Sequence, residues 1–181
     1  MTADDCPRPG VTLEGVAALK PAFRPDGTVT AGNACPLNDG AAAVVVMSDV
    51  KARQLGLTPL ARVVSTAVSA LSPEIMGLGP VEATSRALAR AGLTIGDIDL
   101  VEMNEAFAAQ VVAAARRLGI DEERLNVYGG AIAVGHPFGM TGGRIATTLI
   151  HALQERDGEL GLETMCIGGG QGMAMVLERC S

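Results

Sequence analysis

The turn around His136 contains the residues whose types most clearly suggest chemistry. His136 lies between Gly135 and Pro137, and six glycines stand among the eighteen residues from Tyr128 to Ile145. Glycine lets a backbone approach a ligand closely or adopt positive φ, while proline fixes its own φ and biases the preceding residue toward an extended conformation. An imidazole in such a turn can be aimed for acid–base work. Taken alone, however, the motif fits a structural histidine in a strand-to-helix turn better.

A second candidate is the pair Asn104-Glu105, which follows a predicted strand and opens a predicted helix. Asn104 could cap that helix, with Glu105 complementing the positive end of the helix dipole. The functional alternative is that the Asn104 carboxamide holds a water molecule or a carbonyl oxygen. The local sequence leaves both interpretations open.

A third candidate is Cys166, which stands just before the glycine-rich run 168–172. A buried cysteine is usually a small hydrophobic residue, and a glycine run can be only a tight turn. The N–H groups of such a run can also form an oxyanion hole, and a thiol in an electropositive site can ionise near neutral pH as a base or nucleophile. The GxG spacings do not indicate a dinucleotide site, because no acidic residue follows a fitting strand.

These three turns need a scaffold, and the apolar pattern predicts an α/β fold to hold them. The predicted strands are 41–47, 60–70, 98–103, 126–134, 162–167 and 173–178, and the predicted helices are 12–20, 48–55, 80–91, 105–118 and 141–154. Alternating strands and helices predict right-handed crossovers and a largely parallel sheet, made mixed by an antiparallel pair formed by the last two strands. Sites in such sheets form where the strands end.

The chain is predicted to divide into an irregular arm, residues 1–40, and one α/β domain, residues 41–181. Proline and glycine interrupt the arm repeatedly, which disfavours regular structure there. Long loops are unusual in a compact domain unless they are functional. We therefore expect the arm to lie across another part of a protein.

The composition excludes several classes of protein. The chain has 181 residues, 48% of them hydrophobic, which fits one folded domain with a full core. A formal net charge of −6 without a basic run argues against a nucleic-acid partner. Four cysteines and two histidines without metal-ligand spacing predict no metal site. With no recognisable signal peptide and no apolar run of membrane length, we expect a cytoplasmic protein with reduced thiols and no membrane partner.

The three turns together resemble a known family, the thiolases, which comprise acetyl-CoA acetyltransferases and 3-ketoacyl-CoA thiolases. Asn104-Glu105-Ala106-Phe107, the run 130–137 and Cys166-Ile167-Gly168-Gly169-Gly170 stand in the order and spacing of that family, as do the motifs at 20–23, 26–34 and 38–42. The resemblance covers residues 8–179 and only the C-terminal half of a thiolase. It implies an α/β, thiolase-like C-terminal domain: a mixed, mostly parallel five-stranded sheet with helices on both faces. The arm would come from the end of the loop region that covers coenzyme A.

The resemblance also implies roles for the candidate residues. Thiolases cleave or condense β-ketoacyl thioesters through a covalent acyl-enzyme. His136 would activate the nucleophile, and its Nε2 would bind the thioester oxygen of the enolate-forming acetyl group together with a water held by Asn104. Cys166 would take the α-proton of acetyl-CoA in synthesis and return it in thiolysis. The N–H of Gly168 would belong to a second oxyanion hole, and Glu105 would steady the network around Asn104 or His136.

Coenzyme A and acetyl-CoA are the implied substrates, with no permanently bound cofactor. The residues expected to contact them are Phe23, Ala31, Cys35, Met76 and Phe107. Cys35 stands where many thiolases have a serine that touches coenzyme A. It is therefore interpreted as a ligand-loop residue and not as a substitute nucleophile.

The family's nucleophilic cysteine belongs to an N-terminal half that this sequence does not contain. In one interpretation, the chain is the C-terminal part of an acyltransferase of lipid metabolism, such as fatty acid β-oxidation, inactive alone and completed by an N-terminal half or another thiolase subunit. In the other, it is a non-catalytic acyl-CoA-binding or subunit-interaction module. A solitary half would leave a face of the helix at 105–118 uncovered, so we expect self-association and a homo-oligomer.

Overall fold

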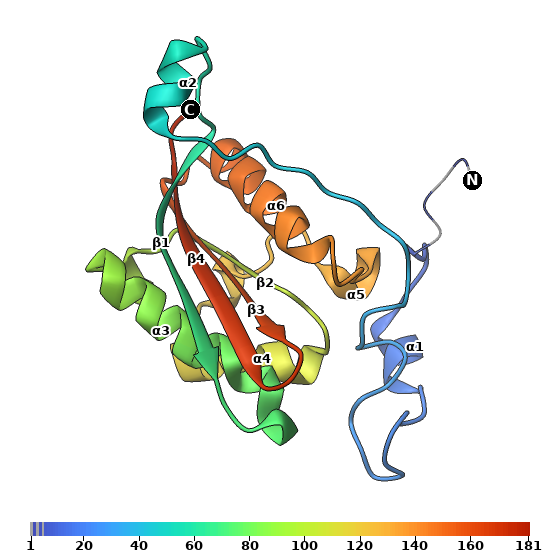
Figure 1. Ribbon diagram of the computed structural model, residues 1–181. Helices are drawn as coiled ribbons and strands as arrows, with labels where there is room; N and C mark the ends of the chain where they lie inside the picture. Colours follow the sequence, from blue (N-terminus) through green and yellow to red (C-terminus); the bar gives the residue numbers. More distant parts are fainter. Residues whose placement is uncertain (1, 3, 5) are drawn as a thin grey trace.

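The computed structural model describes residue 2, residue 4 and residues 6–181. Its helices are α1 (Leu13–Ala17), α2 (Asp49–Gln54), α3 (Gly79–Ala91), α4 (Ala108–Leu118), α5 (Ala131–Val134) and α6 (Thr141–Glu155), with 3₁₀ helices η1 (Pro73–Leu78), η2 (Ile95–Asp97) and η3 (Glu122–Arg124). The strands are β1 (Ala61–Ala70), β2 (Leu100–Met103), β3 (Leu160–Ile167) and β4 (Gln171–Arg179). They form a sheet in the order β1-β4-β3-β2, with α3 and α4 on one face and α6 on the other (Figure 1).

Four helix ends fall at capping residues that the sequence offers. The side chains of Thr12 and Ser48 each accept a backbone hydrogen bond at the start of α1 and α2. Gly92 and Gly119 end α3 and α4 in the left-handed conformation that glycine adopts without strain. The predicted helices are therefore confirmed, although α4 begins at Ala108 and not at residue 105.

The α/β fold with helices on both sides of a mixed sheet is confirmed, but the sheet differs from the prediction in two ways. The described residues form four strands and not five. Only β2 and β3 pair in parallel, because β4 lies between β1 and β3 and is antiparallel to both. The sheet is therefore mainly antiparallel and not mostly parallel.

The segment 41–47 was predicted to be a strand, and this prediction is wrong for the described structure. These residues run as an extended trace from the arm past α6 to α2 (Figure 1). Val45 and Val46 are 85% and 80% exposed. A strand needs a neighbouring strand for its backbone hydrogen bonds, and none lies beside this apolar segment.

The predicted strand at 126–134 is also wrong, because the side chain of Asn126 takes the place of a strand beside β2. Asn126 Oδ1 accepts from the Met103 N–H at 2.8 Å, and Asn126 Nδ2 donates to the Met103 carbonyl at 2.9 Å. The backbone of Asn126 has a φ of 47°, which turns the chain away from an extended path. The following residues then form the single-turn helix α5.

The core has two layers, one on each face of the sheet. Leu162 and Val176 pack with the residues of α3 and α4, while Leu177 packs with Leu149 and Leu153 of α6. Strand residues alternate between the two faces, so each layer draws on every second residue. These layers hold the carboxyl ends of β2 and β3 in place.

An apolar area on the α6 side of the sheet is not covered. We call it the open sheet face; it comprises Val63, Val68 and Met173, which are 49%, 47% and 44% exposed. Val68 pairs with Met173, and Val63 with Leu177, in the register of β1 and β4. The expected uncovered face on α4 is reduced to Val112, since α4 buries Val111, Ala114 and Ala115. Exposed apolar side chains therefore lie on the open sheet face and on residues 44–47, and also on the arm, where Leu13, Phe23 and Leu37 are 81%, 74% and 92% exposed.

Candidate active site

Asn104 and Cys166 are delivered by the ends of two adjacent parallel strands. Asn104 directly follows β2, and its N–H donates to the carbonyl of Thr164 on β3 at 3.0 Å. Cys166 stands two residues after Thr164, near the end of β3. Asn104 is fully buried, and the N-cap of α4 is Phe107, so Asn104 does not cap that helix. The carboxyl ends of parallel strands are the usual position for a site in this kind of sheet.

The imidazole of His136 lies between two polar side chains that define its hydrogen bonding. Nε2 lies 3.2 Å from Asn104 Nδ2, and Nδ1 lies 2.6 Å from Thr141 Oγ1. Because the Thr141 hydroxyl donates to the Pro137 carbonyl at 3.0 Å, its oxygen is left to accept from an Nδ1–H. This assigns the proton to Nδ1 and leaves the lone pair of Nε2 facing the Asn104 amide.

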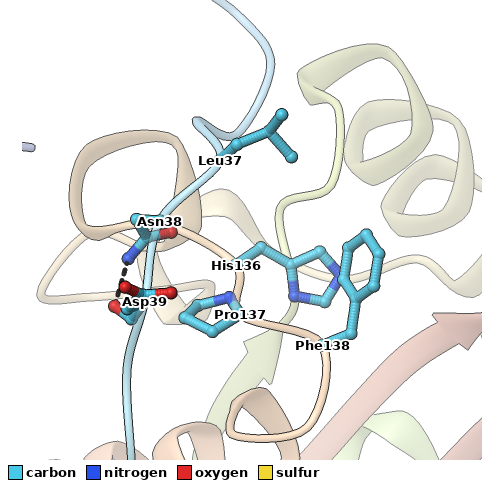
Figure 2. Close-up of a pocket in the computed structure, with 6 residues that line it drawn as sticks. All are labelled: Leu37, Asn38, Asp39, His136, Pro137 and Phe138. Atoms are coloured by element: carbon cyan, nitrogen blue, oxygen red, sulfur yellow. Dashed lines mark hydrogen bonds between the residues drawn. The ribbon is translucent and has the colours of Figure 1, made fainter.

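The turn that holds His136 also forms a pocket against the arm. Leu37, Asn38, Asp39, His136, Pro137 and Phe138 line an open pocket of about 410 Å³ (Figure 2). Gly135 has a φ of 93°, and a Cβ there would overlap the side chain of Asn38. The Phe138 ring packs edge-to-face against the imidazole, with 4.9 Å between the ring centroids. Figure 2 shows that arm residues 37–39 pass beside the histidine.

Glu105 makes its hydrogen bonds to groups other than its two predicted partners, Asn104 and His136. Its Oε1 accepts from Asn126 Nδ2 at 2.9 Å, and its Oε2 accepts from the Ile132 N–H at 3.1 Å. A Cβ at Gly130 would overlap its carboxyl group. Glu105 therefore joins the end of β2 to α5, the helix that leads into the His136 turn.

Cys166 is buried, with 5% of its surface exposed. Burial is the main cause that raises the pKa of its thiol, and the nearby Cys35 raises it further, against a backbone hydrogen bond that lowers it. Cys166 is thus a neutral thiol at neutral pH and not a thiol that an electropositive site ionises. Gly168 lies exposed in the turn after β3, with open space around it.

The residues expected to contact coenzyme A fall into two groups. The Cys35 N–H donates to the Ala106 carbonyl at 3.1 Å. The Phe23 and Phe107 rings pack edge-to-face, with 6.2 Å between the ring centroids. The arm is thereby fastened next to the Asn104 turn. Ala31 lies exposed on the arm, and Met76 lies half-buried in η1, on a separate segment that packs against α4.

One charged group, the Arg144 guanidinium on α6, acts on the histidine. Burial lowers the pKa of His136 below its ordinary value, and the Arg144 guanidinium lowers it further. Burial also raises the pKa of Glu102 to about 7 and of Glu163 to about 8, although Arg144 opposes both shifts. The imidazole is therefore neutral at neutral pH, which is the state that accepts a proton.

Sequence reasoning missed Thr141, Asn38 and the cluster of Glu102, Glu163 and Arg144. Thr141 had a local signal, since a hydroxyl five residues after a histidine starts the next helix. The glutamates had a weaker signal, two acids inside otherwise apolar strands. In the described part of the chain, no group of three or more potential metal ligands comes together. No helix among the described residues is long and apolar enough to cross a membrane.

Fold and site together define an α/β protein with an acid–base group, an amide and a thiol gathered at one edge of its sheet. Comparison with known proteins narrows this class: the family model for the thiolase C-terminal domain matches residues 57–179, and that for the thiolase N-terminal domain matches residues 1–50. The chain belongs to the thiolase family.

Its relatives are acyltransferases of about twice its length. The chain is 58% identical to the acetyl-CoA acetyltransferase of Escherichia coli (strain K12) over 97% of its own residues and 45% of that protein. The crystal structure of the Bacillus anthracis acetyl-CoA acetyltransferase superposes with a TM-score of 0.95 at 49% identity, over 97% of this chain and 45% of that one. The structure of human mitochondrial 3-ketoacyl-CoA thiolase in complex with CoA superposes with a TM-score of 0.93 at 48% identity, over 100% of this chain and 46% of that one.

Proposed function

We propose that this chain supplies the C-terminal part of an acyl-CoA acyltransferase site of the thiolase type, which carries out thiolysis or Claisen condensation of acyl-CoA thioesters. The observation that supports this most strongly is the imidazole of His136, with Nδ1 on the Thr141 hydroxyl and Nε2 at 3.2 Å from the Asn104 amide. A neutral histidine with its Nε2 lone pair directed at a site is arranged to accept a proton.

His136 would act first as a base and then as an oxyanion donor. It takes the proton of a nucleophilic thiol on Nε2, and that same N–H then donates to the thioester oxygen as charge develops there. Asn104 Oδ1 is buried and has no hydrogen-bond partner among the described residues, so it can accept from a water molecule that donates to the same oxygen. Each preorganised donor to such an oxygen typically contributes about 3 to 4 kcal/mol.

Cys166 would move the α-proton, with the Gly168 N–H donating to the acyl-enzyme oxygen. In thiolysis, a β-ketoacyl thioester loses its acyl group to the nucleophile, and the departing enolate of acetyl-CoA takes the proton of the Cys166 thiol. The raised pKa of Cys166 keeps that proton in place and suits this direction. In condensation, Cys166 must first lose its proton, and a basic group close to its sulfur would be required.

The nucleophile and further walls of the substrate site would come from an N-terminal thiolase portion, on the same polypeptide or on a partner. The chain spans 45% of the length of its E. coli relative, and its first 50 residues match the thiolase N-terminal domain. The exposed apolar segment 41–47 belongs to that match and would pair as a strand in the sheet of the N-terminal portion. The open sheet face would be covered in the same assembly.

Coenzyme A and acetyl-CoA are the proposed substrates, with no permanent cofactor. The arm segment at Phe23 and Cys35, fastened beside Phe107, would cover the coenzyme A moiety, with Ala31 and Met76 nearby. A homo-oligomeric enzyme of lipid metabolism in the cytoplasm, including a part in fatty acid β-oxidation, completes the proposal.

A second candidate function is a non-catalytic acyl-CoA-binding or subunit-interaction module. One observation favours it: burial raises the pKa of the thiols of Cys35 and Cys166, so neither of these two is activated as a nucleophile. In that case the site residues would bind a thioester without turning it over.

Assays of acetoacetyl-CoA thiolysis separate the two functions. The chain would be measured alone and then fused behind the N-terminal portion of its E. coli relative. The proposal predicts turnover only in the fusion, with a loss of about 10²-fold or more for His136→Ala, the usual range for removing a general base. A correctly folded fusion that binds acetyl-CoA without turnover would support the binding module instead.

A further inference from the structure

Three ionisable side chains, two of them buried, come together where α6 packs against β2 and β3. Glu102 on β2 and Glu163 on β3 are paired in the register of the two parallel strands and are 2% and 9% exposed. Arg144, in the first turn of α6, is 16% exposed in its side chain, and its Nη1 lies 3.5 Å from Glu102 Oε2. The cluster therefore links the sheet to the start of the helix that follows His136.

Burial of this cluster destabilises the fold, because some of its polar atoms lack hydrogen-bond partners. Glu102 Oε1, Glu163 Oε2 and Arg144 Nε are buried without a hydrogen-bond partner among the described residues. Burying charged groups costs several kcal/mol each unless they are well paired, and apolar residues of similar volume are often more stable at such positions. Fold stability alone therefore does not account for the presence of the cluster.

The contacts of α6 connect this cluster to the imidazole. Helix α6 begins at Thr141, whose hydroxyl holds His136 Nδ1, and Arg144 lies about one turn further along the same helix. The Arg144 charge also acts on the imidazole directly, because it disfavours a second proton on the ring. Arg144 thus influences both where the ring points and how readily it is protonated.

We propose that Arg144, held by its contact with Glu102, is a positioning residue that keeps the Nε2 of His136 unprotonated and its Nδ1–H on the Thr141 hydroxyl. The inference extends the proposed function, in which His136 is a base. The charged groups that act on Arg144 are Glu102 on β2, Glu105 just after β2 and Glu163 on β3. Burial raises the pKa of Glu102 to about 7 and of Glu163 to about 8, so both carboxyl groups are largely protonated where His136 titrates. Glu102 Oε2 accepts a hydrogen bond from Arg144 Nη1 at 3.5 Å, and the positive charge of the guanidinium acts on His136.

The chain offers a direct readout, because it has only two histidines, His136 and His151. ¹⁵N chemical shifts of the imidazole nitrogens report both the tautomer and the midpoint of titration for each ring. His151, exposed on α6, serves as an internal reference. This measurement needs no turnover, so it is independent of whether the fusion enzyme is active.

The proposal predicts different results for two substitutions. Arg144→Met should raise the titration midpoint of His136 and reduce the population of its Nδ1–H tautomer. Glu102→Gln should leave the midpoint nearly unchanged, because the Glu102 carboxyl, whose pKa is raised to about 7, is already largely protonated where His136 titrates. Arg144→Lys keeps the charge and should stay close to the wild type. Arg86→Met, on the opposite face of the sheet, is the matched control and should change nothing.

A merely structural cluster would give a different pattern. Arg144→Met would then lower the stability of the chain while leaving the His136 midpoint and tautomer unchanged in the folded protein, and that result would overturn the proposal. If Arg144→Met does not fold, Arg144→Gln, which keeps a hydrogen-bonding side chain without the charge, decides in its place, because an unchanged midpoint there contradicts the inference. Failure of the fusion to turn over, with these shifts intact, would refute only the proposed function.

Discussion

Replacing Glu163 with glutamine should flatten the pH dependence of the chain's stability. Burial raises the pKa of Glu163 from its ordinary value of 4.5 to about 8, and the neighbouring Glu102 reinforces the shift. A carboxyl group whose pKa is higher in the folded state binds a proton more tightly there than in the unfolded chain. Its contribution is therefore complete at low pH and is lost as the pH rises from about 4.5 through about 8.

The magnitude follows from the difference between the folded and unfolded pKa. Each pH unit between the two values is worth about 1.4 kcal/mol, so ionisation of Glu163 alone should remove about 3 kcal/mol of stability between about pH 6 and about pH 9. Glu102, whose pKa is raised to about 7, adds a loss of the same sign at lower pH. Glutamine cannot ionise, so the variant keeps only the part due to Glu102.

Urea unfolding followed by circular dichroism at several pH values measures this directly. The quantity to compare is the change of unfolding free energy with pH, because the absolute stability of the variant also includes the cost of burying the new amide. Glu155→Gln, an exposed carboxylate at the end of α6, is the control and should keep the wild-type slope. Parallel curves for the wild type and Glu163→Gln would refute the reasoning.

Three further predictions concern the His136 turn, the contact of that turn with the arm, and the open sheet face. Thr141→Val should remove the acceptor of the His136 Nδ1–H and mix the two tautomers in ¹⁵N spectra, whereas Thr141→Ser should restore the wild-type pattern. Gly135→Ala should destabilise the chain by at least about 1 kcal/mol in urea, because a non-glycine residue at φ 93° is strained and its Cβ would overlap Asn38. Val68→Thr should reduce self-association in sedimentation and the binding of an apolar dye, and a dye-negative monomeric wild type would contradict that account.

More of the site's local geometry than of the sheet's strand pairing could be predicted from the sequence. His136 and Asn104 stand in turns and Cys166 near the end of β3, each beside glycine or polar residues that are local signals. The structure brings His136 Nε2 and Asn104 Nδ2 to 3.2 Å. Their chemical roles came from the resemblance and stay predictions. Helix ends were also readable, because caps such as Ser48 and Gly92 are local.

The strand errors have non-local causes. The apolar segment 41–47 has the composition of a buried strand, but no strand of the described residues pairs with it. Asn126 replaces a strand with side-chain hydrogen bonds to Met103, which no periodicity reveals. The Glu102–Glu163 pairing depends on the register of two strands about sixty residues apart, so burial and the resulting pKa shifts could not be read from composition.

The central claim is that His136 and Cys166 perform separate steps of one acyl transfer, and half-reactions of the fusion protein test it most directly. Release of coenzyme A from acetyl-CoA measures formation of the acyl-enzyme, and deuterium exchange at the acetyl α-carbon measures proton transfer. The account predicts that Cys166→Ala keeps the release but loses the exchange, while His136→Ala loses both. Exchange that persists at the wild-type rate in Cys166→Ala would contradict it.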